Sequence, residues 1–261
     1  MRGRCAAVAL AALLLPACSG GSGDVVGGAA TGAGAASAGA GVAGTVTVLA
    51  AASLTVPLTD LATAWERANP GAAVRLSFGS STTLAQQVAQ GAPADLLATA
   101  GTQPLVQLGD VTPTETTIIA RNTLEIATPP EDPAGVGGIA DLGRSDVDVV
   151  LCVESAPCGK AADQVLAAAG VTAHVVSREV DAAATLTKVA LGEADAAVVY
   201  HSDVVSSDGR VRGVEIPADQ NTTLDYPLAR FTDTATAVGF AAYLGGPQGR
   251  AGLTAAGLLS P

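Results

Sequence analysis

Four places in the sequence put a small residue at the start of a predicted helix, just after a predicted buried strand. Backbone N–H groups at a helix start lack acceptors within the helix and carry a partial positive charge of about half a unit. In a parallel α/β sheet these starts lie at the carboxyl ends of the strands, where ligands bind. Several of them together would bind an anion without any lysine or arginine side chain. The four places are Ser53, Ser81, Cys158-Gly159 and Asp181-Ala182.

Other roles are open for the polar residues around these helix starts. Serine is a frequent N-cap residue, so Ser53 and Ser81 could simply cap their helices. Asp95 and Asp203 could form a carboxylate pair for acid–base catalysis, but no nucleophile, base and orienting group come together in the sequence around them. We expect both acids to accept hydrogen bonds from backbone N–H groups. They should not contact an anion directly, because like charges repel.

Apolar, β-branched runs alternate along the chain with segments of helical spacing, which predicts an α/β fold. The first three strands and two helices alternate in the order typical of a parallel sheet. The pattern predicts strands at 45–50, 74–78, 95–98, 147–153, 174–176 and 196–200, and extended segments at 211–216 and 225–231. It predicts helices at 57–69, 84–91, 159–169, 181–191, 235–244 and 248–259, and a loop at 129–138.

Residues 1–17 have the order of a secretory signal, with Arg2 and Arg4 before the apolar run 6–15. The run is shorter than a membrane span of about 20 residues. Because Cys18 ends the cleavage site, the segment resembles a bacterial lipoprotein signal, which implies a lipid on this cysteine; the alternative is a plain signal peptide. Residues 18–44, rich in Gly and Ala, would form a flexible tether. We therefore expect a folded domain outside the cell, held at the outer face of the membrane by its lipid anchor only.

Two of the four cysteines, Cys152 and Cys158, remain once the signal and the lipidation site are set aside. Disulfides persist outside the cytoplasm, and five intervening residues suit a small loop, so we predict a disulfide between them. A zinc site would need further ligands, and His174 and His201 do not have the required spacing. A secreted hydrolase that uses Cys158 with His174 or His201 is a remote alternative, which a disulfide would eliminate.

The charge balance excludes one class of partner. When Arg2 and Arg4 leave with the signal, the basic residues fall from 13 to 11 against 24 acids, a net charge near −13. Nucleic-acid binding depends on clustered Lys and Arg, so no nucleic acid is expected. The 217 residues from Thr45 to Pro261 are enough for one large domain or two modest ones.

Four segments resemble the extracytoplasmic molybdate-binding proteins of ATP-driven transporters, in the family's order and over nearly all of the mature chain. They are 50–54 (AAASL), 78–84 (FGSSTTL), 91–96 (GAPADL) and 198–203 (VVYHSD). The resemblance implies a two-lobed periplasmic-binding-protein fold of type II, with mixed sheets, helices on both faces and a hinge cleft. It also implies that the chain crosses between lobes near Asn122 and near Tyr226-Pro227. Lobe I would then comprise 45–121 and 227–261, and lobe II 122–226.

Carried over residue by residue, the resemblance implies the ligand contacts. Ser53 and Ser81 would each give a hydroxyl and a backbone N–H, Tyr200 its phenolic O–H, and Cys158 and Ala182 a backbone N–H each. The family often has alanine where Cys158 stands and valine where Ala182 stands, and backbone donation survives both changes. The oxyanion's metal would be bound only through its oxygens, without direct protein ligands or a cofactor. His201, where the family commonly has glycine, is expected to have no role in binding.

The resemblance implies a monomeric solute receptor, not an enzyme, that binds molybdate or tungstate and delivers it to a membrane permease. Selectivity would follow cavity size, since a smaller dianion leaves buried N–H groups unpaired, at about 1–3 kcal/mol each. A receptor for sulfate, phosphate or another tetrahedral oxyanion is the alternative in this class. A purely structural surface lipoprotein is a third possibility.

Overall fold

The computed structural model of the protein describes residues 42–261. The predicted signal 1–17, the predicted lipidation site Cys18 and the predicted tether up to residue 41 lie outside the described residues. Strand β1 begins at Ala43, so the last two residues of the predicted tether belong to the sheet. Across 42–261, no helix has the length and apolar character needed to cross a membrane.

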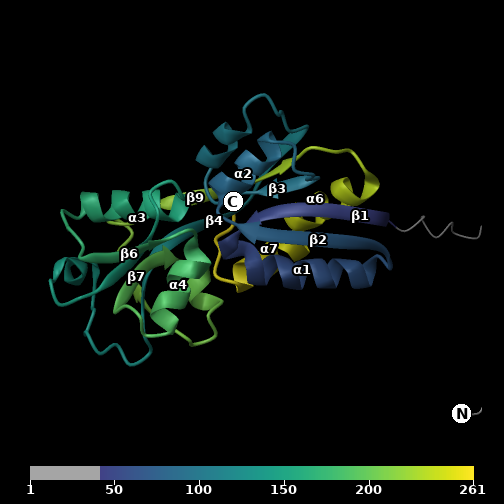
Figure 1. Ribbon diagram of the computed structural model, residues 1–261. Coiled ribbons are helices and arrows are strands. Elements are labelled where there is room, and N and C mark those ends of the chain that lie inside the picture. The colour runs from purple at the N-terminus through teal and green to yellow at the C-terminus, as the bar shows by residue number, and fades with distance from the viewer. Residues whose placement is uncertain (1–41) are drawn as a thin grey trace, which may run out of the picture. The chain divides into compact units, whose positions relative to one another are not determined.

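The amino-terminal part confirms the predicted strand–helix alternation (Figure 1). Strand β1 pairs in parallel with both β2 and β3, which places β1 between them. Strands β1 and β2 each end just before a buried helix start, because the apolar run stops where a small residue begins the turn. The elements are β1 (Ala43–Ala51), the 3₁₀ helix η1 (Ala52–Leu54), α1 (Thr55–Ala68), β2 (Gly71–Gly79), α2 (Ser81–Ala89), β3 (Leu96–Ala98) and the 3₁₀ helix η2 (Gln103–Leu108).

The middle of the chain repeats this pattern. Strand β5 pairs in parallel with β6 and β7, so three more carboxyl ends meet at one edge. The elements are the 3₁₀ helix η3 (Ile139–Gly143), β5 (Val149–Cys152), α3 (Pro157–Ala168), β6 (Val175–Glu179), α4 (Ala182–Ala190), β7 (Ala196–Tyr200) and α5 (His201–Val205). The short helix α5 was absent from the prediction.

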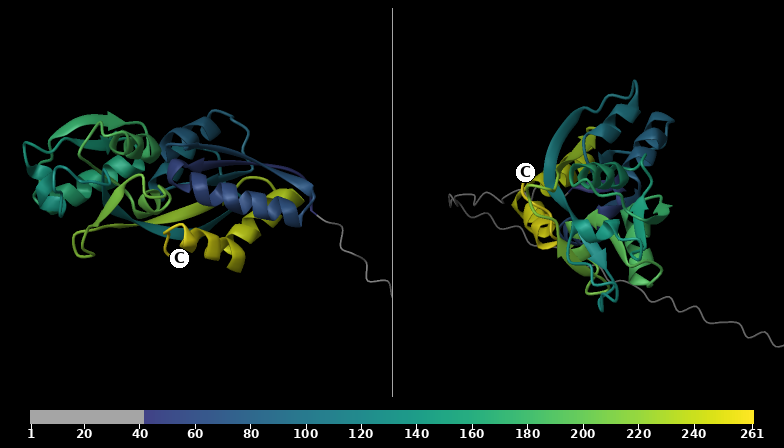
Figure 2. Two further views of the ribbon diagram at one scale, coloured as in Figure 1. Left: turned by 90° about the horizontal axis from the view of Figure 1, so that it is seen from below. Right: turned by 90° about the vertical axis from the view of Figure 1, so that its left-hand side faces the viewer.

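Two long antiparallel strands join the two groups of parallel strands. Strand β4 (Glu115–Thr128) pairs with β9 (Thr223–Arg230), and β9 also pairs with β3, whereas β4 also pairs with β7 and with β8 (Arg212–Glu215). The strand order is β2-β1-β3-β9-β4-β7-β5-β6, with β8 paired to β4. The sheet is therefore mixed, as predicted, and β4 and β9 run from one group of parallel strands to the other (Figure 2).

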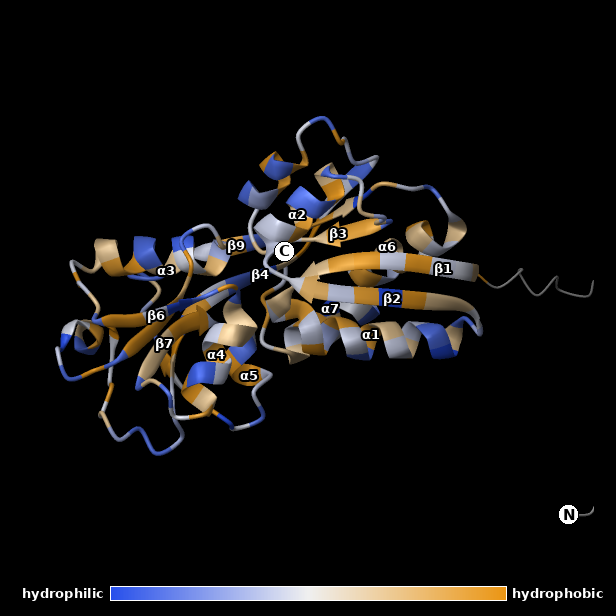
Figure 3. Cartoon of the chain, in the orientation of Figure 1, coloured by the Kyte–Doolittle hydropathy of each residue, from blue (hydrophilic) through white to orange (hydrophobic). Residues whose placement is uncertain are grey.

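Helices cover both faces of the sheet, as the alternation of buried side chains requires. In β1, Val46 and Val48 pack in the cluster that contains α1 and α6 (Ala235–Gly245), whereas Leu49 packs with α2 on the other face. In β5, Leu151 lies in the cluster of α3, and Val150 in that of α4. In Figure 3, β3 and β7 are coloured as largely apolar, whereas the helices carry both apolar and polar residues.

The carboxyl-terminal helices pack on the amino-terminal part, α6 on β1 and α1, and the last helix on α1. The ring of Phe240 in α6 lies 5.1 Å from that of Trp65 in α1, between centroids. Helix α7 (Pro247–Ala255) is shorter than the predicted 248–259. It ends because Gly257 has a φ of +88°, a left-handed conformation that favours glycine. Leu259 then forms a β-bridge with Arg121 of β4 instead of continuing the helix.

Candidate functional site

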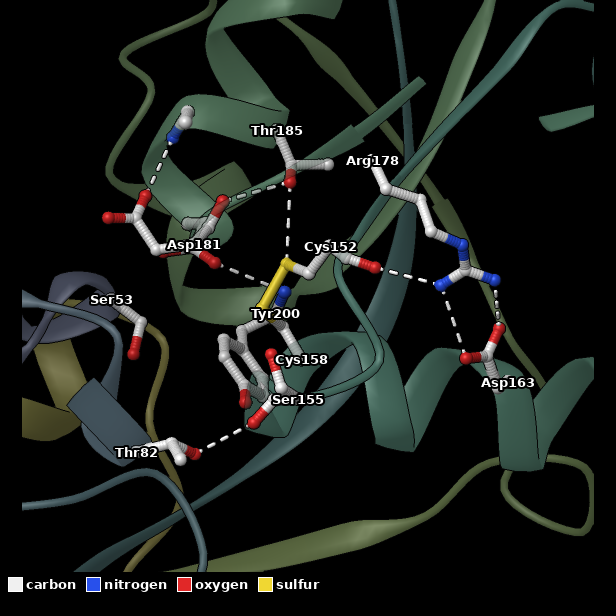
Figure 4. Close-up of a disulfide and its surroundings, with 12 residues drawn as sticks. Ser53, Thr82, Cys152, Ser155, Cys158, Asp163, Arg178, Asp181, Thr185 and Tyr200 are labelled. Atoms are coloured by element: carbon white, nitrogen blue, oxygen red, sulfur yellow. Dashed lines mark hydrogen bonds and ion pairs between the residues drawn. A yellow bond between two sulfur atoms is a disulfide. The ribbon is translucent and has the colours of Figure 1, made fainter. Parts of the chain in front are cut away.

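All five residues of the predicted ligand set line one small cavity. Ser53 and Ser81 come from the strands and helices of the amino-terminal part, whereas Cys158, Ala182 and Tyr200 come from the group around β5. Figure 4 shows Ser53, Cys158 and Tyr200 around the same space. The parallel strands explain this convergence, because both groups of helix starts lie at carboxyl strand ends.

Backbone N–H groups of four helix starts border the cavity. Ser53 lies in η1, which leads into α1; Ser81 is the first residue of α2; and Ala182 is the first of α4. Cys158 follows Pro157, whose fixed φ suits the first position of α3. First-turn N–H groups have no acceptor inside their helix, and the helix dipoles add positive potential there.

The sequence left open whether Ser53 and Ser81 cap their helices. In the structure neither serine does so, and both hydroxyls have other partners. Neither η1 nor α2 has a side-chain hydrogen bond at its N-cap, and these caps are Ala51 and Ser80. Ser53 Oγ lies 2.9 Å from the Tyr226 hydroxyl. Ser81 Oγ accepts the backbone N–H of Ala100 at 3.0 Å, which leaves its own proton free for another acceptor.

Tyr200 ends β7 and brings an unpaired hydroxyl to the cavity. Its side chain is 2% exposed, and within residues 42–261 its hydroxyl has no hydrogen-bond partner. Burial raises the pKa of the phenol well above its usual range, so it remains protonated and can donate. The ring packs edge-on against Tyr226, with centroids 6.0 Å apart, which fixes its position. A buried hydroxyl without a partner is costly, so this group points to a missing acceptor.

The predicted disulfide is confirmed and shapes the loop before α3. Cys152 ends β5, and its sulfur is bonded to that of Cys158 in the first turn of α3. Arg178 donates to the Cys152 carbonyl oxygen at 2.9 Å and also binds the Asp163 carboxylate (Figure 4). Gly159 is required here, because a Cβ at this position would lie 2.2 Å from the Val153 carbonyl oxygen.

The same bond removes the hydrolase alternative. A sulfur in a disulfide has no thiolate to attack a substrate. The two candidate histidines are engaged elsewhere: His201 Nδ1 lies 2.7 Å from Glu125 Oε2, and His174 Nδ1 lies 3.2 Å from Asp148 Oδ1. His201 thus has a carboxylate partner that the sequence did not indicate.

The side chains of the cavity lining include one acid, Asp181, and no lysine or arginine among the described residues. The Asp181 carboxylate caps α4 by accepting the Ala184 N–H at 2.9 Å. Within residues 42–261, no group of three or more His, Cys, Asp and Glu side chains could hold a metal ion. The arrangement therefore offers neutral hydrogen-bond donors, which suit an anion.

Asp95 and Asp203 have the structural roles expected from the sequence. Asp95 accepts the Thr47 N–H at 2.8 Å and the Thr232 hydroxyl at 2.7 Å. Asp203 accepts the Tyr200 N–H at 3.2 Å. Desolvation raises the pKa of the buried Asp203 carboxyl to about 7, although the hydrogen bond from the Tyr200 N–H acts in the opposite direction and lowers this pKa.

A larger cleft of about 660 Å³ adjoins the cavity and shares Ala100, Ala156 and Pro157 with it. The Thr82 hydroxyl of α2 donates to the Ser155 carbonyl oxygen at 2.8 Å, across to the disulfide loop. The sequence analysis gave Thr82 no role, although this residue lies within the segment 78–84 that carries the family resemblance.

The model of the family described as bacterial extracellular solute-binding protein matches residues 46–259. The chain belongs to this family. A relative from Mycobacterium tuberculosis, named molybdate-binding protein ModA, is 34% identical over 221 residues, which are 83% of this chain and 85% of the relative. Because the chain belongs to a family of solute-binding proteins, it is a binding protein and not an enzyme. The disulfide at Cys158, which removes the hydrolase alternative, agrees with this.

Two solved structures share the fold. The periplasmic molybdate-binding protein of Azotobacter vinelandii superposes with a TM-score of 0.71 at 21% identity, over 83% of this chain and 99% of that one. The sulfate-binding protein SubI of Mycobacterium tuberculosis also gives 0.71, at 19% identity, over 82% and 86%. The predicted two-lobed periplasmic-binding-protein fold is thus confirmed.

Proposed function

We propose that this protein binds molybdate, or the similar tungstate, outside the cell membrane and delivers it to an ATP-driven permease. The observation that carries the proposal is the buried Tyr200 hydroxyl, which lacks a partner within residues 42–261 and lies in a cavity lined by four helix starts. The name of the Mycobacterium tuberculosis relative supports the choice of anion.

The proposed ligand contacts are the backbone N–H groups of Ser53, Ser81, Cys158 and Ala182 and the hydroxyls of Ser53, Ser81 and Tyr200. A tetrahedral dianion has four oxygens that can accept from all sides. Neutral donors in a water-poor cavity bind it more strongly than they would in water, because the local dielectric is low. The donors come from both groups of parallel strands, so the anion would hold the two together.

A receptor for sulfate or phosphate is the second candidate, and the fold shared with a sulfate-binding protein makes sulfate the closer competitor. Size would exclude sulfate, since a smaller ion leaves buried N–H groups unpaired, at about 1–3 kcal/mol each. Phosphate carries a proton at neutral pH and needs an acceptor. The Ser81 hydroxyl already accepts from Ala100, so it faces the anion as a donor. Among the described residues, the one acid of the lining, Asp181, accepts the Ala184 N–H as the cap of α4, and a protonated phosphate would need this carboxylate as its acceptor.

Titration calorimetry of the purified protein with molybdate, tungstate, sulfate and phosphate tests the proposal. Molybdate and tungstate should bind, raise the melting temperature by mass action, and outcompete sulfate. Phosphate should not compete at equal concentration. Equal or tighter binding of sulfate or phosphate would transfer the function to the second candidate, and no binding of any of the four would refute oxyanion binding.

We also propose that the protein is a monomer. We further propose that it is lipid-anchored, with Cys18 lipidated after removal of residues 1–17. The segment 18–41 would tether the folded part near its permease. Mass spectrometry should find an acylated amino-terminal Cys18, and Cys18→Ala should release the protein from membranes. An unmodified mature chain would contradict the anchor.

For the lobes we keep the predicted division into 45–121 with 227–261 and 122–226. The long strands β4 and β9, which contain residues 122 and 227, support it. Spin labels placed on α1 and α3 should move closer when molybdate is added. A constant distance would contradict closure of these two parts.

A further inference from the structure

A buried chain of hydrogen bonds leads from the middle of β4 to the cavity. Asn122 Nδ2 lies 2.8 Å from Ser202 Oγ and 3.2 Å from the Tyr226 hydroxyl, which in turn lies 2.9 Å from Ser53 Oγ. Asn122 and Tyr226 are both fully buried. None of the three partners Asn122, Tyr226 and Ser202 belongs to the predicted ligand set.

The positions of the protons in this chain follow from its acceptors. Asn122 Oδ1 accepts the Thr123 N–H at 3.1 Å, which fixes the amide so that its nitrogen donates to both hydroxyls. Tyr226 therefore accepts from Asn122 and must place its own proton elsewhere. Ser53 Oγ is the other group in contact with this hydroxyl. Since a buried hydroxyl proton is rarely left unbonded, Tyr226 donates to Ser53.

This direction determines what Ser53 can do. Its oxygen accepts from Tyr226, so its own proton is free to point into the cavity that Ser53 lines. Each donor in such a chain is polarised by the one before it, which strengthens the last bond. Ser53 thus resembles Ser81, whose oxygen accepts from Ala100.

We infer that Asn122 and Tyr226 are positioning residues that turn the Ser53 hydroxyl into an oriented donor for the bound anion. The inference rests on the proposed function. Asn122 also contacts Ser202, which is two residues after Tyr200, so one amide connects donors from both sides of the cavity. Asn122 lies on β4 and Tyr226 on β9, and in this antiparallel pair Tyr226 is opposite Ala120 and Asn122 is opposite Leu224. The two strands that join the parallel groups therefore also align the site.

The test is a double-mutant cycle on anion affinity, built on Tyr226→Phe. This change keeps the ring, and with it the edge-on packing against Tyr200, but removes the hydroxyl. Molybdate binding should weaken about 2- to 10-fold, the value of one neutral hydrogen bond and its polarising effect. In the Ser53→Ala background, Tyr226→Phe should have no further effect. In the Ser81→Ala background, it should keep its full effect, because Ser81 has a separate partner.

Two controls separate this outcome from a general structural effect and from failure of the proposed function. Tyr243→Phe changes a tyrosine that stacks on Phe240, away from the cavity lining, and should leave affinity unchanged. Wild-type protein that binds no oxyanion refutes the proposed function and this inference together. Wild-type protein that binds molybdate, with equal effects of Tyr226→Phe in the Ser53→Ala and Ser81→Ala backgrounds, refutes this inference alone.

Discussion

Replacement of Tyr200 by phenylalanine should separate binding from stability. The change removes one oxygen and leaves the ring against Tyr226, with centroids 6.0 Å apart. The hydroxyl has no partner within residues 42–261, so no hydrogen bond of the described protein is lost. Burying a hydroxyl without a partner costs about 1–3 kcal/mol, so Tyr200→Phe should leave the ligand-free protein as stable as wild type or more stable.

Anion binding should change in the opposite direction. A hydrogen bond to a charged group contributes about 1.5–3 kcal/mol, so Tyr200→Phe should weaken molybdate binding by about 10- to 150-fold. Titration calorimetry measures the affinity, and thermal denaturation without ligand measures the stability. The shift in melting temperature caused by a fixed molybdate concentration should shrink accordingly.

Tyr243→Phe is the matched control, because it removes a phenolic oxygen from helix α6 outside the cavity lining. It should change neither quantity. If Tyr200→Phe binds molybdate as tightly as wild type, the Tyr200 hydroxyl does not contact the anion. If it melts well below wild type without ligand, the hydroxyl has a structural partner and the reasoning from its unpaired state is wrong.

Three further outcomes are expected. Replacing both Cys152 and Cys158 by alanine should lower the free energy of unfolding by only about 2 kcal/mol, because the loop that the disulfide closes is short. Molybdate binding should be retained, because residue 158 still offers its backbone N–H. Non-reducing mass spectrometry of the wild type should find no free thiol at these two cysteines. The Asp203 carboxyl has its pKa raised from 3.8 to about 7 by burial, so the folded state keeps a proton that the unfolded state loses. Stability should therefore fall as pH rises from about 4 to about 7, by up to about 4 kcal/mol from this group, and Asp203→Asn should flatten that slope in denaturant titrations. Thr82→Val removes the hydrogen bond to the Ser155 carbonyl oxygen and should weaken molybdate binding about 2- to 10-fold. Thr83→Val, on the exposed side of the same helix turn, should leave the affinity unchanged. Equal affinities of the two variants would show that the Thr82 bond does not help to close the protein around the anion.

Local sequence patterns predicted the positions where helices start at the ends of buried strands. Apolar runs and the small residues after them are short-range features, so the starts near Ser81, Cys158 and Ala182 could be placed before any contact was known. The disulfide was predictable for a similar reason, because its two cysteines are only six positions apart. The predicted end of α7 was wrong because Gly257 has a left-handed backbone conformation, which ends the helix. The residues around Gly257 have helical spacing, so the sequence pattern did not indicate this end.

The side-chain partners of the site needed the tertiary structure. Ser53 and Tyr226 are 173 positions apart, and Asn122 and Tyr226 are 104 apart. Their contacts depend on how β4 and β9 pair in antiparallel register, and a strand's own sequence does not state its partner or its register. The sequence by itself determined which backbone N–H groups would stand at helix starts, because helix periodicity is local. Only the packing of distant strands decided which hydroxyls accept, which donate, and which, like that of Tyr200, remain unpaired at the cavity.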